Sequence, residues 1–170
     1  MEDLLKNLQT EFEKYNGRFR IVSTDHLKEL REDIEELRRG GGITEEFYLE
    51  NLSFLQFEKP DVLPTARSII VIAIPQGITV VTFKVDGKDH NAVIPPTYIY
   101  EDIRDTCKDS LGRILGEADR EIVRTALPLK LLAVRSGLGR YGRNNISYVE
   151  GMGSFHRLEA FYTNYPFGVD

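Results

Sequence analysis

The run Ser68–Pro75, SIIVIAIP, constrains the fold of this chain more than any other segment. It is apolar and rich in β-branched residues, which favours a strand. Because successive side chains of a strand point to opposite faces, an unbroken apolar run must be covered on both sides. We therefore expect this strand at the centre of a sheet that has helices packed on it.

Turn residues and periodicity predict the elements around this strand. Segment 78–85 alternates in polarity, and Asp86-Gly87 predicts a tight hairpin with segment 88–94. The fold class is therefore α+β, with a central mixed β-sheet, a β-hairpin and helices packed on the sheet. The other predicted elements are helices over 2–15, 25–39, 44–52, 100–117 and 128–136, and strands over 19–22, 146–149 and 158–162.

Length and composition set the outer bounds. A chain of 170 residues is expected to form a single α+β domain over 1–170, with a helical N-terminal part over 1–55. The net charge of −5 argues against nucleic acid as the main partner. The start, MEDLLKNLQTEFEKY, is too polar for a signal peptide, and no apolar run approaches the roughly 20 residues of a membrane span. We expect a cytoplasmic protein without a membrane partner.

The segment Leu127–Asn145, LPLKLLAVRSGLGRYGRNN, is the strongest indication of a ligand site. A second glycine cluster, EGMGSFH, follows at 150–156. Glycine allows a ligand to approach the backbone closely and permits positive φ, and the interleaved Arg and Asn side chains are fixed donors. The pattern predicts a loop that wraps a large ligand rich in oxygen acceptors. Its glycines and arginines are Gly137, Gly139, Gly142, Arg135, Arg140 and Arg143.

The glycines also match the spacing G-x-G-x-x-G of dinucleotide-binding loops. That motif binds a dinucleotide between a strand and a helix, with an acidic residue about 20 positions later. Here the glycines follow a predicted helix and precede a predicted strand, and no crossover helix fits between Gly142 and Glu159. The order of elements argues against a Rossmann site.

The same residues resemble the epoxyqueuosine reductase family. Ser136–Asn144 is similar to that family's AGLGWxGKN-like loop, and Gly153–Phe155 is similar to its GSW-like element, which an apolar strand follows. Pro64–Ser68 and Pro96–Tyr100 resemble parts of its N-terminal region. The resemblance covers about residues 64 to 164, and the glycine loop is its sharpest part.

The resemblance implies a cobalamin-binding domain, related in fold to the corrinoid region of reductive dehalogenases. It implies an oxidoreductase in which this domain supplies the corrinoid cradle. The cofactor-binding residues that it predicts are Gly137, Leu138, Gly139, Tyr141, Gly142, Arg143, Asn144, Gly153, Ser154 and Tyr98.

Two departures from the family matter. Its members continue into a ferredoxin-like module with two iron–sulfur clusters, whereas this chain has one cysteine, Cys107, where a cluster needs about four. The electrons are therefore expected from an iron–sulfur domain or protein outside this sequence. The family also carries an acid in a VDSAP-like segment, which is IVRTALP here, at Ile122–Pro128. No catalytic residue is assigned. A substrate other than epoxyqueuosine is favoured, and it would be a tRNA or a small molecule.

The other reactive groups have simpler interpretations. His26 and His90 are expected on solvated surfaces, and no histidine has a metal-ligand spacing, so no metal site is predicted. His156 is expected to make a structural hydrogen bond beside Gly153. Cys107 lies on an apolar helix face and is expected to be a packed core thiol.

Tyrosines are the remaining candidate proton donors. Tyr141 is either a ligand contact or a structural residue, and it could donate a proton if Arg140 or Arg143 lowers its pKa. Tyr98 and Tyr100 are expected more at the edge of the core than in contact with a ligand.

Two alternatives to a corrinoid domain remain open. The first is a non-catalytic docking module that has lost the cofactor, which the missing acid and clusters favour and the intact glycine loop opposes. The second is a reductase that binds a flavin or a nicotinamide.

Overall fold

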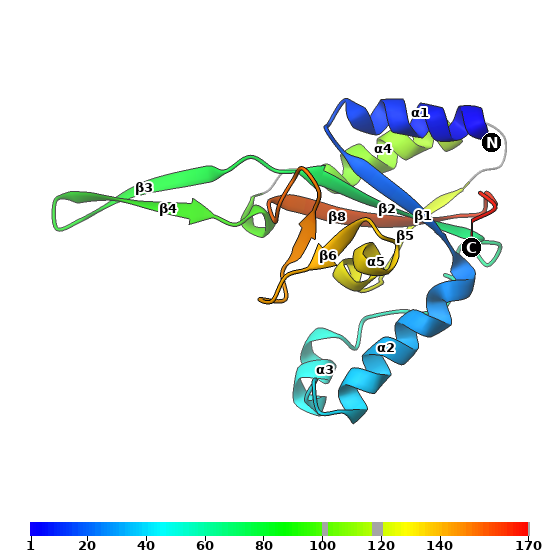
Figure 1. Cartoon of the computed structure of the whole chain (residues 1–170), viewed down its shortest axis with the longest axis horizontal. Helices are drawn as coiled ribbons and strands as arrows, with labels where there is room; N and C mark the ends of the chain where they lie inside the picture. The colour runs from blue at the N-terminus through cyan, green and yellow to red at the C-terminus, as the bar shows by residue number, and fades with distance from the viewer. Residues whose placement is uncertain (100–101, 117–120, 170) are drawn as a thin grey trace.

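The computed structural model describes residues 1–99, 102–116 and 121–169, and Figure 1 shows the whole chain. Tyr100 and the end of the helix expected over 100–117 lie outside the described residues. The helices are α1 Glu2–Glu13, α2 Leu27–Arg39, α3 Glu45–Asn51, α4 Ile103–Leu115 and α5 Leu129–Arg135, with 3₁₀ turns η1 Thr24–His26 and η2 Pro96–Tyr98. The strands are β1 Arg18–Ser23, β2 Ser68–Pro75, β3 Thr79–Val85, β4 Lys88–Ile94, β5 Ile122–Arg124, β6 Gly139–Tyr141, β7 Ser147–Val149 and β8 His156–Thr163.

The core of the molecule is a four-stranded sheet in the order β1-β2-β8-β5. β2 is an inner strand of this sheet, and its residues Ile69 to Ile74 are buried, which confirms the expectation from the apolar run. β2 pairs with β1 on one side and with β8 on the other, with Ile70 opposite both Ile21 and Phe161. The α+β class is confirmed. All strand pairs in the described part of the chain are antiparallel, so the sheet is more uniform than the mixed sheet that was expected.

Helices cover both faces of the sheet, as Figure 1 shows. On one face, α1 and α4 pack with Phe12 and Leu111 against Ile70 and Phe161. On the other face, α2 and α5 contribute to a second cluster around Val71 and Ala160, which includes the buried side chains of Leu27, Leu30, Leu132 and Ala133. Apolar residues on both faces of β2 therefore specify a three-layer arrangement.

The β3–β4 hairpin extends away from this body as an arm (Figure 1). Asp86 and Gly87 both have positive φ, 51° and 75°, the geometry that a two-residue turn of type I′ requires. One face of the arm carries Val81, Phe83 and Val85, which are all exposed. The turn was therefore predicted correctly from the sequence. No described residue buries the exposed face, so the arm is stabilised mainly by the hydrogen bonds between β3 and β4.

Two strands differ from the expectation. The glycine segment was expected as a loop, but Gly139–Tyr141 forms β6 and pairs with β7. β5 was not expected, and it pairs with the end of β8, with Val123 opposite Tyr162. Among the described residues, no helix combines the length and the hydropathy that a membrane crossing would need.

Candidate functional site

The glycine segment forms a short hairpin that begins where α5 ends. Gly137 has φ 72° just after the helix, and the N–H of Leu138 donates to the carbonyl of Ala133, which closes the last turn of α5. The side chain of Leu138 is buried in the core. Leu138, which was expected at the cofactor, therefore anchors the hairpin with its side chain.

Two of the glycines fit tightly against the partner strand β7. A Cβ on Gly139 would lie 3.0 Å from the carbonyl oxygen of Tyr148. A Cβ on Gly142 would lie 2.5 Å from Cε2 of the Tyr148 ring and 2.8 Å from Oδ1 of Asn144. Both glycines are therefore crowded by the hairpin itself, and a side chain at either position would have to displace neighbouring atoms. A valine at Gly139 would press its Cβ against the carbonyl oxygen of Tyr148, so Gly139→Val would perturb the hairpin as well as any ligand contact.

The outer surface of this hairpin is rich in donors and aromatic rings. Arg140, Arg143 and Asn144 are exposed, and Arg140 lies opposite Tyr148 across the β6–β7 ladder. Asn144 also braces the turn, because its Oδ1 accepts from the N–H of Ile146. Such a surface can offer hydrogen bonds and flat apolar contact to a large ligand.

Tyr141 does not have the electrostatics that a proton donor would need. Its side chain is 41% exposed, and partial burial raises the pKa of its phenol. Proton donation would need Arg140 or Arg143 to lower this pKa, and the direction is the opposite. Tyr141 is therefore better suited to contact than to proton transfer near neutral pH.

The second glycine cluster is joined to the hairpin. The N–H of Val149 donates to the carbonyl of Gly153 at 3.0 Å, and Gly153 has φ 62°. His156 is buried, with its Nε2 3.2 Å from the hydroxyl of Ser147 and its Nδ1 3.1 Å from the carbonyl of Gly153. Burial lowers the pKa of this imidazole. The expected structural role of His156 is confirmed, and Ser154 beside it is half-buried.

Tyr98 lies on a different element, η2, which follows the arm. Its side chain is 72% exposed, so Tyr98 is not at the edge of the core as expected. Arg157 on β8 holds η2 in place, with Nη1 3.5 Å from the carbonyl oxygens of Pro96 and Ile99. The structure therefore joins residues 137–144 to Gly153 and Ser154, and it leaves Tyr98 as an exposed ring on a separate turn.

The other reactive groups lie away from this surface. Cys107 is buried on the inner face of α4, and desolvation, with a smaller effect of the Glu159 charge, raises the pKa of its thiol to about 12. His26 contacts Glu29, and His90 stacks on Phe83 of the arm. Within 1–99, 102–116 and 121–169, no cluster of three or more His, Cys, Asp or Glu side chains is arranged to hold a metal ion.

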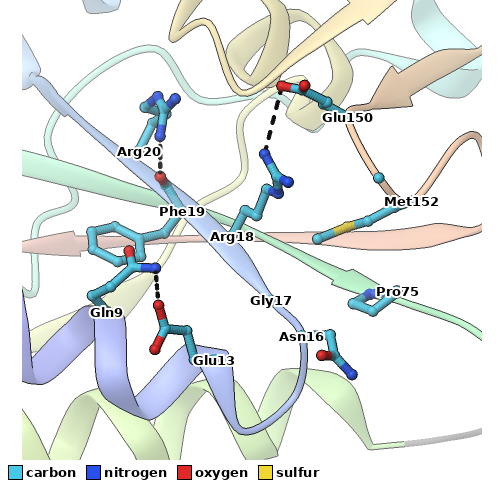
Figure 2. Close-up of a pocket in the computed structure, with 11 residues that line it drawn as sticks. Gln9, Glu13, Asn16, Gly17, Arg18, Phe19, Arg20, Pro75, Glu150 and Met152 are labelled. Atoms are coloured by element: carbon cyan, nitrogen blue, oxygen red, sulfur yellow. Dashed lines mark hydrogen bonds and ion pairs between the residues drawn. The ribbon is translucent and has the colours of Figure 1, made fainter.

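Sequence reasoning missed a groove of about 650 Å³ beside the second glycine cluster (Figure 2). It runs along β1 and is lined by Arg18 and Arg20, by Gln9 and Glu13 of α1, and by the turn 150–152. Its only sequence signal is the pair of arginines two positions apart in a short strand. The groove includes none of the residues that were predicted to bind the cofactor.

No model of a known protein family matches the sequence, and no curated protein matches it. Solved structures match the fold. One is an epoxyqueuosine reductase with a tRNA-Tyr epoxyqueuosine-modified stem loop, with a TM-score of 0.64 and 20% identity over 99% of this chain. An epoxyqueuosine reductase from Bacillus subtilis, with its catalytic loop swung out of the active site, matches with a TM-score of 0.62 and 20% identity over 99% of this chain. An epoxyqueuosine reductase from Streptococcus thermophilus matches with a TM-score of 0.60 and 22% identity over 100% of this chain.

This similarity establishes a shared fold. The chain spans just under half the length of these solved proteins, 46% of the first two and 48% of the third. What those proteins bind and reduce is therefore not carried to this chain by the fold alone.

Proposed function

We propose that this chain is a cobalamin-binding region of an epoxyqueuosine reductase-like reductase, with electrons supplied by an iron–sulfur domain or protein outside this sequence. The observation that carries the proposal is the fold match over 99–100% of the chain, together with the glycine hairpin that resembles that family's loop. Neither is sufficient alone, because folds host many functions.

The residues on the open side of the hairpin fit a large, flat ligand. At Gly137 and Gly153, no described atom beyond the adjacent residues lies within 4 Å of the place that a Cβ would occupy, so a ligand can approach the backbone there. Arg143 and Asn144 would donate to the amides of a corrinoid, and Tyr141 would contact its edge. The surface is open rather than enclosed, which fits a cofactor covered from the other side by a second domain.

When bound, a corrinoid supplies a low-valent metal centre for reduction. This chain would bind and orient it and exclude water from one of its faces. The segment Ile122–Pro128 carries no carboxylate, and the phenol of Tyr141 has a raised pKa. No proton donor is therefore assigned to this segment or to Tyr141, and a substrate other than epoxyqueuosine, either a tRNA or a small molecule, is favoured.

The test is a titration of the purified chain with cobalamin, followed by visible absorption, with oxidised and chemically reduced cobalamin. Saturable binding is expected, with a spectrum in which the lower base has left the metal. Arg143→Gln should weaken binding by about tenfold, because a charge-assisted hydrogen bond is lost. Arg39→Gln, at an exposed position on α2, is the matched control and should bind as the unaltered chain does.

Two results would decide between this proposal and a docking module. If cobalamin binds only after an iron–sulfur domain is supplied, the proposal of a cobalamin site stands, and this chain forms only part of that site. Absence of binding to oxidised and to reduced cobalamin, both without and with that domain, would reject the cofactor and favour the docking module. A yellow, flavin-containing preparation would support the third alternative.

A further inference from the structure

The groove along β1 exposes a free sheet edge. β1 is an edge strand of the sheet, whose order is β1-β2-β8-β5, and the groove lies against the first three residues of β1. Gly17 precedes the strand, and a Cβ there would lie 2.7 Å from Cδ1 of Ile74 and 3.1 Å from the carbonyl oxygen of Phe12. The backbone itself therefore lines the groove at this point.

The register identifies which backbone groups face outward. The N–H of Gln76 donates to Phe155 on the β8 side, so even-numbered residues of β2 face β8 and odd-numbered ones face β1. Those odd residues pair with Arg18, Arg20 and Val22, which leaves the N–H and C=O groups of Phe19 and Ile21 on the side of β1 that faces away from β2. The guanidinium of Arg20 donates to the outward carbonyl of Phe19 at 3.0 Å, in agreement with this direction.

Opposite charges lie on the two sides of this edge. Arg18 and Arg20 share one face of the strand, with Arg18 Nη1 3.7 Å from the carboxylate of Glu150, which is 91% exposed. Glu13 and Gln9 of α1 line the other side and hydrogen-bond to each other at 2.7 Å (Figure 2). Glu150 therefore holds the place that an incoming carboxylate would take.

We infer that this edge binds an extended peptide segment by strand addition, with acidic side chains at alternate positions. Its backbone would pair with Phe19 and Ile21, and its carboxylates would face Arg18 and Arg20. The residues between them would face Glu13 and Gln9. Main-chain hydrogen bonds supply affinity in this mode, and the two arginines supply specificity.

A second copy of this chain is a poor occupant of the same edge. Antiparallel pairing of two β1 strands centred on Phe19 would place Arg18 opposite Arg20, and pairing centred on Arg20 would place that residue opposite itself. Like charges directly opposite one another destabilise a ladder. A strand that places carboxylates opposite Arg18 and Arg20 is the better match for this edge.

The probe is a fluorescein-labelled peptide of four Thr-Glu repeats, whose binding is followed by fluorescence anisotropy at low salt. Saturable binding is expected, and the combined R18E and R20E variant should weaken it by at least about tenfold. The same variant should instead bind a Thr-Lys peptide. Glu150→Gln should tighten binding of the Thr-Glu peptide, because it removes the internal competitor for Arg18. Arg39→Glu on α2 is the matched charge control.

Strand addition is separated from simple charge attraction by two measurements. A Pro-Glu repeat keeps the carboxylates but lacks the N–H groups that would pair with the edge, so it should bind at least about tenfold more weakly. Hydrogen exchange of the Phe19 and Ile21 amides should slow when the Thr-Glu peptide binds. Equal binding of the Pro-Glu peptide, unchanged exchange, or unchanged affinity in the R18E and R20E variant with native circular dichroism would each overturn the inference.

Discussion

The ring of Tyr148 lies directly over Gly142, at the place where any other residue would put its Cβ. The N–H of Gly142 donates to the carbonyl of Ile146 at 2.8 Å, so the glycine is held at the turn of the β6–β7 hairpin. The side-chain Nδ2 of Asn144 donates to the Tyr148 hydroxyl at 3.4 Å and closes the same turn. The hairpin that carries most of the proposed cofactor contacts is thus packed around one aromatic ring.

Gly142→Ala is expected to destabilise the protein by about 2 kcal/mol, because the added methyl overlaps the Tyr148 ring and Oδ1 of Asn144, and both side chains would have to shift. Chemical denaturation measures the loss. Gly77→Ala is the control, since no described atom lies within 4 Å of its added Cβ and it should change little. Equal stability of the two variants would show that Tyr148 moves aside freely.

An ion pair fastens the two helices on the opposite face of the sheet. Glu11 of α1 is buried and accepts from Lys14, from Arg113 of α4 at 2.5 Å and from Ser110. The hydrogen bond from Lys14, followed by that from Arg113, lowers the pKa of Glu11 from 4.5 to about 2. The charged form is therefore the one that the folded state stabilises.

Glu11→Gln is expected to lower the unfolding free energy by about 2 kcal/mol near neutral pH. Since the folded pKa lies below the unfolded one, the contribution of Glu11 is complete above about pH 4.5 and is lost as the pH falls toward 2. Urea denaturation of both proteins between pH 2 and 7 should show the difference shrinking over that window. A difference independent of pH would assign the loss to packing instead.

Much of the fold follows from local sequence. The apolar run of β2 and the Asp86-Gly87 turn each specify their structure within a few residues, and both expectations hold. β5 escaped prediction because its three residues become a strand only by pairing with β8, which lies far away in sequence. Long-range pairing of this kind leaves no periodic signal.

The candidate site was less predictable for two physical reasons. The glycines at 139 and 142 are visible in the sequence, but nothing local tells whether a ligand or Tyr148 excludes their side chains. The groove along β1 forms because α1 and the turn 150–152 meet beside Arg18. That meeting depends on the sheet order, which the sequence alone does not specify.

Cys107 is expected to resist modification in the folded protein. Its thiol is buried, and the pKa of about 12 leaves almost no thiolate at pH 8. Iodoacetamide at pH 8 should leave the native mass unchanged over hours and add one label in guanidinium chloride, as measured by intact mass. Labelling of the native protein at the unfolded rate would show that α4 opens readily.

Thr125 offers a route to a more stable protein. Its Oγ1 is buried and has no hydrogen-bond partner in the described structure, so its hydroxyl loses contact with water without compensation. Thr125→Val keeps the shape and removes the orphaned group, and it should raise the unfolding free energy by about 1 kcal/mol, or the melting temperature by about 2–4 °C. Thr125→Ser, the matched control, keeps the hydroxyl and loses a methyl, so it should melt below the unaltered protein. A valine variant that melts lower than the unaltered chain would mean that a bound water satisfies the hydroxyl.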